Sequence, residues 1–155
     1  MAAAVRVIGI GNAYRSDDGA GLAVASALQR RRLTRVTILT HSGDGASLMD
    51  AFQTDGPLIL ADAARSGAPP GSVRRFDART DRIPSSFFAN STHQFGVVEA
   101  IEMARTLDQL PSRLIIYAVE GKTFAPGTQL SPEIESAIHS VADRIANECA
   151  ALMGD

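Results

Sequence analysis

The side chains best suited to chemistry in this chain are carboxylates and one imidazole that lie far apart in the sequence. Asp17 and Asp18 close a loop that contains several glycines, and Asp62 directly follows an apolar run. His93 falls in the first turn of a predicted helix, where the helix dipole disfavours the imidazolium and leaves a neutral ring for a metal. One imidazole and two carboxylates suit nickel, zinc, cobalt or manganese, with positions open to other ligands. The candidate metal and catalytic residues are therefore one of Asp17 and Asp18, together with Asp62 and His93.

The loop over residues 9–21 begins like a dinucleotide-binding fingerprint but departs from it. The third glycine of the Gly-x-Gly-x-x-Gly pattern would fall at Tyr14, and the adjacent Asp17 and Asp18 would repel a pyrophosphate at the helix N-terminus. We expect the glycines to make a tight turn and to let a helix pack closely, which leaves the aspartates at the mouth of a sheet. One of the two aspartates could instead cap that helix, since Asp is a preferred N-cap residue.

Each candidate residue also has a structural interpretation. Asp62 could accept hydrogen bonds from loop amides or pair with Arg65, because burying a lone carboxylate costs several kcal/mol. His93 could be an ordinary surface or capping residue. We expect His41 only to end a strand and His139 to face solvent.

The C-terminal segment reads as a core helix and offers no nucleophile. Ser131 as N-cap and Pro132 at the first helical position predict its start. Its apolar stripe includes Cys149 and, in chain order, Ile134, Ile138, Val141, Ile145 and Leu152. The chain has no Gly-x-Ser-x-Gly elbow, so neither a serine nor a cysteine nucleophile is supported.

The elements that must position these residues alternate between strand-like and helical patterns. This alternation predicts an α/β fold: one three-layer domain over residues 1–155, with a mostly parallel five-stranded sheet and helices on both faces. Right-handed crossovers would bring the strand-to-helix loops to one edge of the sheet, where such folds bind ligands. The expected strands cover 5–10, 36–40, 57–61, 73–76 and 114–119, and the expected helices cover 19–32, 46–53 and 91–107, with the last starting at Pro132. The third helix is expected to begin at Ser91, with Gln94 completing a capping box.

Composition excludes several classes of function. The 155 residues are 45% hydrophobic and 21% charged, which is typical of a globular domain. A net charge of −2 offers no electrostatic footprint for nucleic acid or an anionic membrane. A single cysteine, no basic and apolar leader and no long apolar stretch predict a cytoplasmic protein. The sequence does not predict an oligomeric state.

Four segments carry short motifs in a fixed order: GIGN at 9–12 with DDGAG at 17–21, LILADA at 58–63, STHQ at 91–94, and the stretch 127–133 before the last helix. In this order they resemble the hydrogenase maturation proteases over nearly the whole chain. The resemblance implies an endopeptidase that removes a C-terminal extension from the large-subunit precursor of a nickel-iron hydrogenase. It also implies that nickel already held by the precursor is the recognition signal, and that the protease has no permanent metal of its own.

Matching motif to motif, the resemblance assigns nickel binding and catalysis to Asp18, Asp62 and His93. It leaves open whether the metal polarises the scissile carbonyl or lowers the pKa of an attacking water, with Asp18 or Asp62 as general base. The first acid of the family is often Glu; Asp18 reaches about one methylene less far, so Asp17 could compete for its role. A Gly-Gly-Thr run common in the family is replaced by Ser-Gly-Asp-Gly at 42–45, and Asp44 could alter the choice of precursor or join the metal shell.

Two other functions remain open from the sequence. The first is a metal-dependent hydrolase of small amides or peptides that holds its own ion. The second is a non-catalytic, chaperone-like binder of the nickel-loaded precursor.

Overall fold

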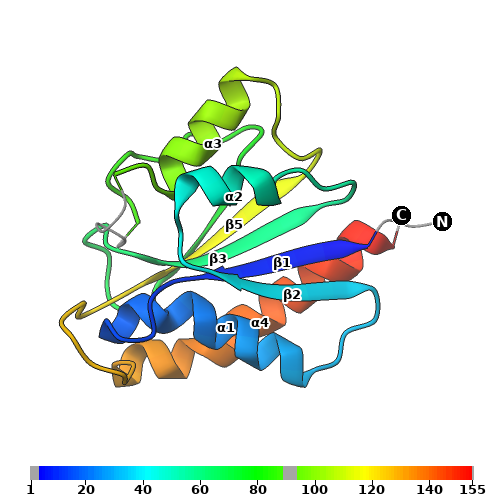
Figure 1. Cartoon of the computed structure of the whole chain (residues 1–155). Helices are drawn as coiled ribbons and strands as arrows, with labels where there is room; N and C mark the ends of the chain where they lie inside the picture. Colours follow the sequence, from blue (N-terminus) through cyan, green and yellow to red (C-terminus); the bar gives the residue numbers. More distant parts are fainter. Residues whose placement is uncertain (1–3, 89–93, 155) are drawn as a thin grey trace.

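A five-stranded sheet runs through the middle of the protein in a computed structural model that describes residues 4–88 and 94–154 (Figure 1). Its strand order is β2-β1-β3-β5-β4, with β4 antiparallel to β5 and the other neighbours parallel. The strands are β1 (Val5–Ile10), β2 (Val36–His41), β3 (Leu58–Ala64), β4 (Val73–Asp77) and β5 (Leu114–Glu120). The helices are η1 (Ser16–Gly19), α1 (Ala20–Arg30), α2 (Gly45–Ala51), α3 (Val97–Thr106) and α4 (Pro132–Met153). The predicted α/β fold with a mostly parallel sheet is confirmed.

Helices cover both faces of the sheet, as the sequence predicts. α1 and α4 pack on one face, and α2 and α3 pack on the other (Figure 1). Every residue of β3 and β5 is buried, because these central strands have helices above and below them. Leu58, Leu60 and Ala64 of β3 belong to the core under α2 and α3. Since strand side chains alternate, Asp62 points to that same face.

Gly9 and Gly21 let α1 approach the sheet backbone, as expected for this loop. A Cβ atom on Gly21 would lie 2.3 Å from the carbonyl oxygens of both Ile10 and Ala61. A Cβ atom on Gly9 would lie 2.3 Å from the carbonyl oxygen of Gly21. A larger residue at either position would push α1 and η1 away from the carboxyl ends of β1 and β3.

Two predicted boundaries were wrong. β3 does not end before Asp62, because Ala63 and Ala64 continue the ladder with Val119 and Glu120 of β5. The third helix does not begin at Ser91: α3 starts at Val97, and the Glu99 side chain accepts a hydrogen bond from the Gly96 N–H at 3.0 Å. The amide of Gly45 donates to the carbonyl of Phe95 at 2.8 Å, so this carbonyl is bonded to the start of α2 and not within a helix. His93 and Ser91 lie outside the described residues.

The C-terminal helix matches its prediction more closely. α4 begins at Pro132 and buries the predicted residues Ile134, Ile138, Val141 and Ile145 against α1 and the sheet. Within residues 4–88 and 94–154, no helix has the length and apolar character needed to cross a membrane.

Candidate active site

Asp18 and Asp62 meet at the carboxyl edge of the sheet, as the sequence predicts. Asp62 is completely buried on β3, and Asp18 in η1 is only 4% exposed. The two carboxylates are close enough for the charge of Asp18 to disfavour ionisation of Asp62. The structure therefore brings together two acids that lie more than forty residues apart in the chain.

Asp62 is a buried carboxyl with very little hydrogen bonding. Its Oδ1 accepts a hydrogen bond from the Ala63 N–H at 2.8 Å, whereas Oδ2 has no partner within the described part of the chain. Burial raises the pKa of Asp62 well above its usual range, the Asp18 charge raises it further, and the Ala63 bond only partly opposes them. The alternative partner, Arg65, forms no ion pair with Asp62 among the residues described. Burial and the neighbouring acid thus favour the neutral form of Asp62, and a cation at its carboxyl group would favour the carboxylate.

Asp17 has the opposite environment, although it adjoins Asp18. It is completely buried and accepts four hydrogen bonds: from the N–H and Oγ of Ser131 at 2.7 and 2.8 Å, and from the amides of Lys122 and Thr123 at 2.8 and 3.0 Å. Burial alone would raise the pKa of Asp17, but these bonds outweigh it and hold the pKa below its ordinary value. Asp17 therefore fixes the loop before α4 and is not the competitor for Asp18 that the sequence allows.

Neither aspartate caps the helix that follows it. No side chain caps η1 or α1, and Oδ2 of Asp18 accepts instead from the Asn12 N–H at 3.1 Å. Ser131, predicted as the N-cap of α4, precedes that helix but directs its hydroxyl to Asp17. The side chains of this region thus bond between loops rather than within their own helices.

The loop that carries the aspartates is joined to the loop after β5 by backbone hydrogen bonds. Ser16 N–H donates to the Gly127 carbonyl at 2.9 Å, and Gly127 N–H donates to the Tyr14 carbonyl at 2.9 Å. Asp17 N–H donates to the Thr123 carbonyl at 3.0 Å. These pairs hold Asp18 in a defined position, because both loops must move together.

Asp44 and His41 have structural roles beside this site. Asp44 is the N-cap of α2, and its carboxylate accepts from the Ser47 N–H at 3.3 Å. His41 ends β2, as predicted, and its Nδ1 accepts from the Gly43 N–H at 2.9 Å. A neutral His41 must then carry its proton on Nε2, which lies 3.0 Å from Ser47 Oγ and donates to it. His41 therefore cannot act as a base toward Ser47.

The remaining candidates agree with their sequence interpretation. His139 is exposed on α4. Cys149 is buried, and burial raises the pKa of its thiol to about 11, so it is not a thiolate nucleophile. Among the described residues, no group of three His, Cys, Asp or Glu side chains could hold a metal. The proposed set Asp18, Asp62 and His93 is not tested by that result, because His93 lies outside those residues.

The segments that flank the residues around His93 lie at the carboxyl edge of the sheet. Phe88 forms a β-bridge with Ala64 at the end of β3. Phe95 accepts a hydrogen bond from Gly45 at the start of α2. The described chain thus leaves from β3 and returns beside α2, both at the edge that carries Asp62.

Glu120 is a buried acid that the sequence interpretation missed. It ends β5 after an apolar run, which is the same signal that singled out Asp62. Its carboxylate accepts hydrogen bonds from the N–H and Oγ of Ser66, the former at 2.9 Å to Oε2, and from the Gly67 N–H at 3.2 Å. Glu120 therefore organises the loop after β3, and the shared signal does not separate it from Asp62.

Comparisons with known proteins identify the family. Residues 22–148 match the sequence profile described as Hydrogenase maturation protease. A hydrogenase expression/formation protein HupD from Thiocapsa roseopersicina is 31% identical over 139 residues, which are 86% of this chain but only 62% of that protein. Hydrogenase 2 maturation protease of Escherichia coli K12 is 26% identical, with 91% of this chain and 87% of that protein aligned.

A solved structure agrees with these sequence matches. The hydrogenase maturating endopeptidase HybD from E. coli superposes with a TM-score of 0.73 at 24% identity, covering 92% of this chain and 89% of that one. At this identity the superposition supports the fold alone. Together with the profile match over most of the chain, it confirms the resemblance seen in the motifs. The chain belongs to the hydrogenase maturation protease family.

Proposed function

We propose that this protein is an endopeptidase that removes a C-terminal extension from the large-subunit precursor of a nickel-iron hydrogenase. The observation that carries the proposal is the buried Asp62 carboxyl, whose Oδ2 has no hydrogen-bond partner within the described residues and which lies beside Asp18. A fold does not keep a second acid next to such a group for stability, because burial and like charge both oppose ionisation. The names of the relatives, a hydrogenase expression/formation protein and a hydrogenase maturation protease, support this activity.

The substrate in this proposal is the precursor together with the nickel that it already holds. Asp18, Asp62 and His93 offer two carboxylates and one imidazole, a donor set that suits nickel and leaves positions for the precursor's own ligands. A cation between the two acids favours the carboxylate form of Asp62, so binding of the loaded precursor would displace its proton. An unloaded precursor lacks that contact and binds more weakly, which makes cleavage depend on loading.

The proton transfer that peptide hydrolysis requires falls to one of the two acids at the site. A carboxylate becomes a stronger base as its pKa rises, so the raised pKa of Asp62 suits this role better than the lowered pKa of Asp17. Asp17 is also saturated with hydrogen bonds, so it has no free position toward substrate. We therefore assign Asp18 and Asp62 to the reaction and give Asp17 the structural role of holding the surrounding loops in place.

The test is incubation of the purified protein with nickel-loaded and nickel-free precursor, followed by intact mass. We expect only the loaded precursor to lose its extension, and we expect Asp18→Ala and His93→Ala to abolish the loss. His139→Ala, an exposed change on α4, is the matched control and should cleave normally. Cleavage of small peptides by protein carrying its own metal would favour the hydrolase alternative. Stable complex formation without any shortening would favour the chaperone-like binder.

A further inference from the structure

A basic cavity lies at the carboxyl ends of β3 and β5, the same edge of the sheet as the two acids. It has a volume of about 550 Å³, and its lining includes Arg15, Arg65, Lys122, Glu120 and Phe124. The cations come from three segments: the loop before η1, the residue after β3 and the loop after β5. A cavity built by three segments around one sheet edge is a preformed place for a ligand.

Two guanidinium groups of this cavity are anchored on the same residue. Arg15 donates from Nε to the carbonyl of Phe124 at 3.3 Å, and the guanidinium of Arg65 lies 5.4 Å from the centroid of the Phe124 ring. The ring itself is fixed by close packing on Gly121, where a Cβ atom would lie 2.5 Å from it. Arg15 keeps four N–H donors beyond the one that it uses here. The arrangement orders both arginines before any ligand arrives.

Basic side chains outnumber acidic ones in the lining of this cavity. Within residues 4–88 and 94–154, neither Arg15 nor Arg65 forms an ion pair, whereas Lys122 pairs with Glu133 at 2.9 Å. Glu120 also lines the cavity, but its carboxylate is bonded to Ser66 and Gly67. The cavity thus presents three basic side chains and one carboxylate, and its two arginines form no ion pair among the described residues.

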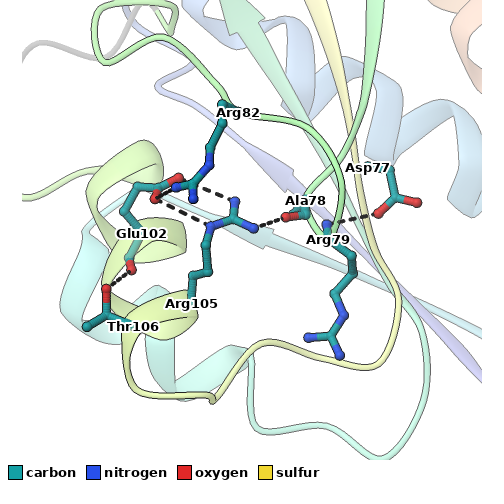
Figure 2. Close-up of polar contacts among 7 residues, drawn as sticks. All are labelled: Asp77, Ala78, Arg79, Arg82, Glu102, Arg105 and Thr106. Carbon is teal, nitrogen blue, oxygen red and sulfur yellow. Dashed lines mark hydrogen bonds and ion pairs between the residues drawn. The ribbon is translucent and has the colours of Figure 1, made fainter.

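Two arginines at the opposite edge of the sheet, Arg82 and Arg105, differ from those of the basic cavity because they bind a carboxylate. There Glu102 of α3 binds Arg82 at 2.8 Å and also Arg105, which reaches the carbonyl of Ala78 (Figure 2). That group is a structural network, because its carboxylate is shared between two cations. Arg79 points away from it (Figure 2) and is exposed. Arg82 and Arg105 thus share a carboxylate, whereas Arg15 and Arg65 form no ion pair among the described residues.

The basic cavity and the two acids are carried by the same segments of the chain. Arg65 directly follows β3, which carries Asp62, and Arg15 directly precedes η1, which carries Asp18. A precursor segment bound at the acids would therefore continue along this edge of the sheet toward the two arginines.

We infer that this basic cavity binds a carboxylate of the precursor's C-terminal extension, either an acidic side chain or the terminal carboxylate. This inference rests on the proposed function. Arginine pairs well with carboxylates, because its planar donors match the two oxygens. The contact would hold the extension without taking part in bond cleavage, so Arg15 and Arg65 are positioning residues that act on substrate binding.

The test measures cleavage kinetics of nickel-loaded precursor by the double variant Arg15→Gln/Arg65→Gln. We expect KM to rise about tenfold for each arginine and kcat to change less than about twofold. Arg79→Gln, at the opposite edge of the sheet, is the matched control and should leave both constants unchanged. Arg65→Lys retains the charge and should recover part of the loss, which a folding defect would not allow.

Two altered precursors identify the source of the carboxylate. One has the acidic side chains of the extension replaced by amides, and the other ends in a C-terminal amide. For the unaltered protein, we expect one of these two precursors to raise KM. With that precursor, the double variant should have the same KM as the unaltered protein. An unchanged KM in the double variant, or an equal loss on both altered precursors, would overturn the inference. If the unaltered protein does not cleave loaded precursor at all, the proposed function fails instead.

Discussion

Asp17 and Asp62 are both completely buried at the same edge of the sheet, yet their surroundings differ in the number of hydrogen-bond donors. Asp17 accepts four hydrogen bonds and its pKa is lowered. Asp62 accepts one, from its neighbour Ala63, and its pKa is raised because burial dominates. A buried carboxylate that the fold satisfies stabilises the fold, and one that the fold leaves unsatisfied is available to a ligand.

The largest expected effect is on activity, in the variant Asp62→Asn. We expect cleavage of loaded precursor to slow by at least about 10³-fold, since an amide neither takes up the proton nor binds a cation as a carboxylate does. Stability should not fall, because the amide oxygen keeps the Ala63 bond and no buried charge is needed there. Initial rates of cleavage, followed by intact mass, measure the activity, and urea unfolding measures the stability. If Asp62→Asn lost stability as well as activity, Asp62 would also be needed for the fold, and it would not differ from Asp17 in this respect.

The second effect is on stability, in the variant Asp17→Ala. It leaves the amides of Lys122, Thr123 and Ser131 without their acceptor, and we expect the free energy of unfolding to fall by about 3–5 kcal/mol. Asp50→Ala, an exposed change on α2, is the control and should cost less than about 0.5 kcal/mol. Urea unfolding measures both. A small loss in Asp17→Ala would mean that the loops around Asp17 hold without it.

The third prediction concerns pH. As pH rises, the contributions of Asp62 and Asp17 to the free energy of unfolding should change in opposite directions. The folded pKa of Asp62 is raised, so the folded protein keeps a proton that the unfolded chain has released, and this group's contribution falls as pH rises through its folded pKa. The folded pKa of Asp17 is lowered, so its contribution is present above its ordinary pKa and is lost as pH falls through the folded value.

Urea unfolding from about pH 2 to about pH 8 separates the two acids. Asp62→Asn should gain stability relative to the unaltered protein as pH rises, and the deficit of Asp17→Asn should shrink at the acidic end. Asp50→Asn, which alters an exposed carboxyl, should run parallel to the unaltered protein. Parallel curves for all three variants would contradict the opposite pKa shifts.

The fold was predictable because its signals are local. The apolar run Leu58–Ala61 predicts a central strand, and Pro132 with the stripe after it predicts α4. The end of β3 and the start of α3 were missed because both depend on partners far away in the chain. Ala63 and Ala64 stay in the sheet by pairing with β5, and Gly45 holds Phe95 outside the helix.

The candidate site was predictable only in part, for the same reason. Adjacent aspartates at 17 and 18 have identical local signals, and only the amides of residues 122, 123 and 131 distinguish them. Glu120 and Asp62 both follow apolar runs, and the loop amides of Ser66 and Gly67 satisfy the first. Motif matching chose Asp18 and Asp62, whereas hydrogen bonding between distant loops, which sequence patterns do not reveal, distinguishes Asp17 and Glu120 from Asp62.

The smallest expected effect is on stability, in the variant Ser131→Ala. It tests how much the Ser131 hydroxyl contributes to holding Asp17 in place. Ser131→Ala removes one of the four hydrogen bonds to Asp17 and leaves the Ser131 amide in place, so we expect a loss of about 1–2 kcal/mol in urea unfolding. Ser140→Ala, an exposed change on α4, controls for helix propensity and should be nearly neutral. Cleavage by Ser131→Ala should stay normal, because Ser131 bonds to Asp17 and not to Asp62. A loss of cleavage without a loss of stability would mean that Asp17 acts on the reaction through Asp18.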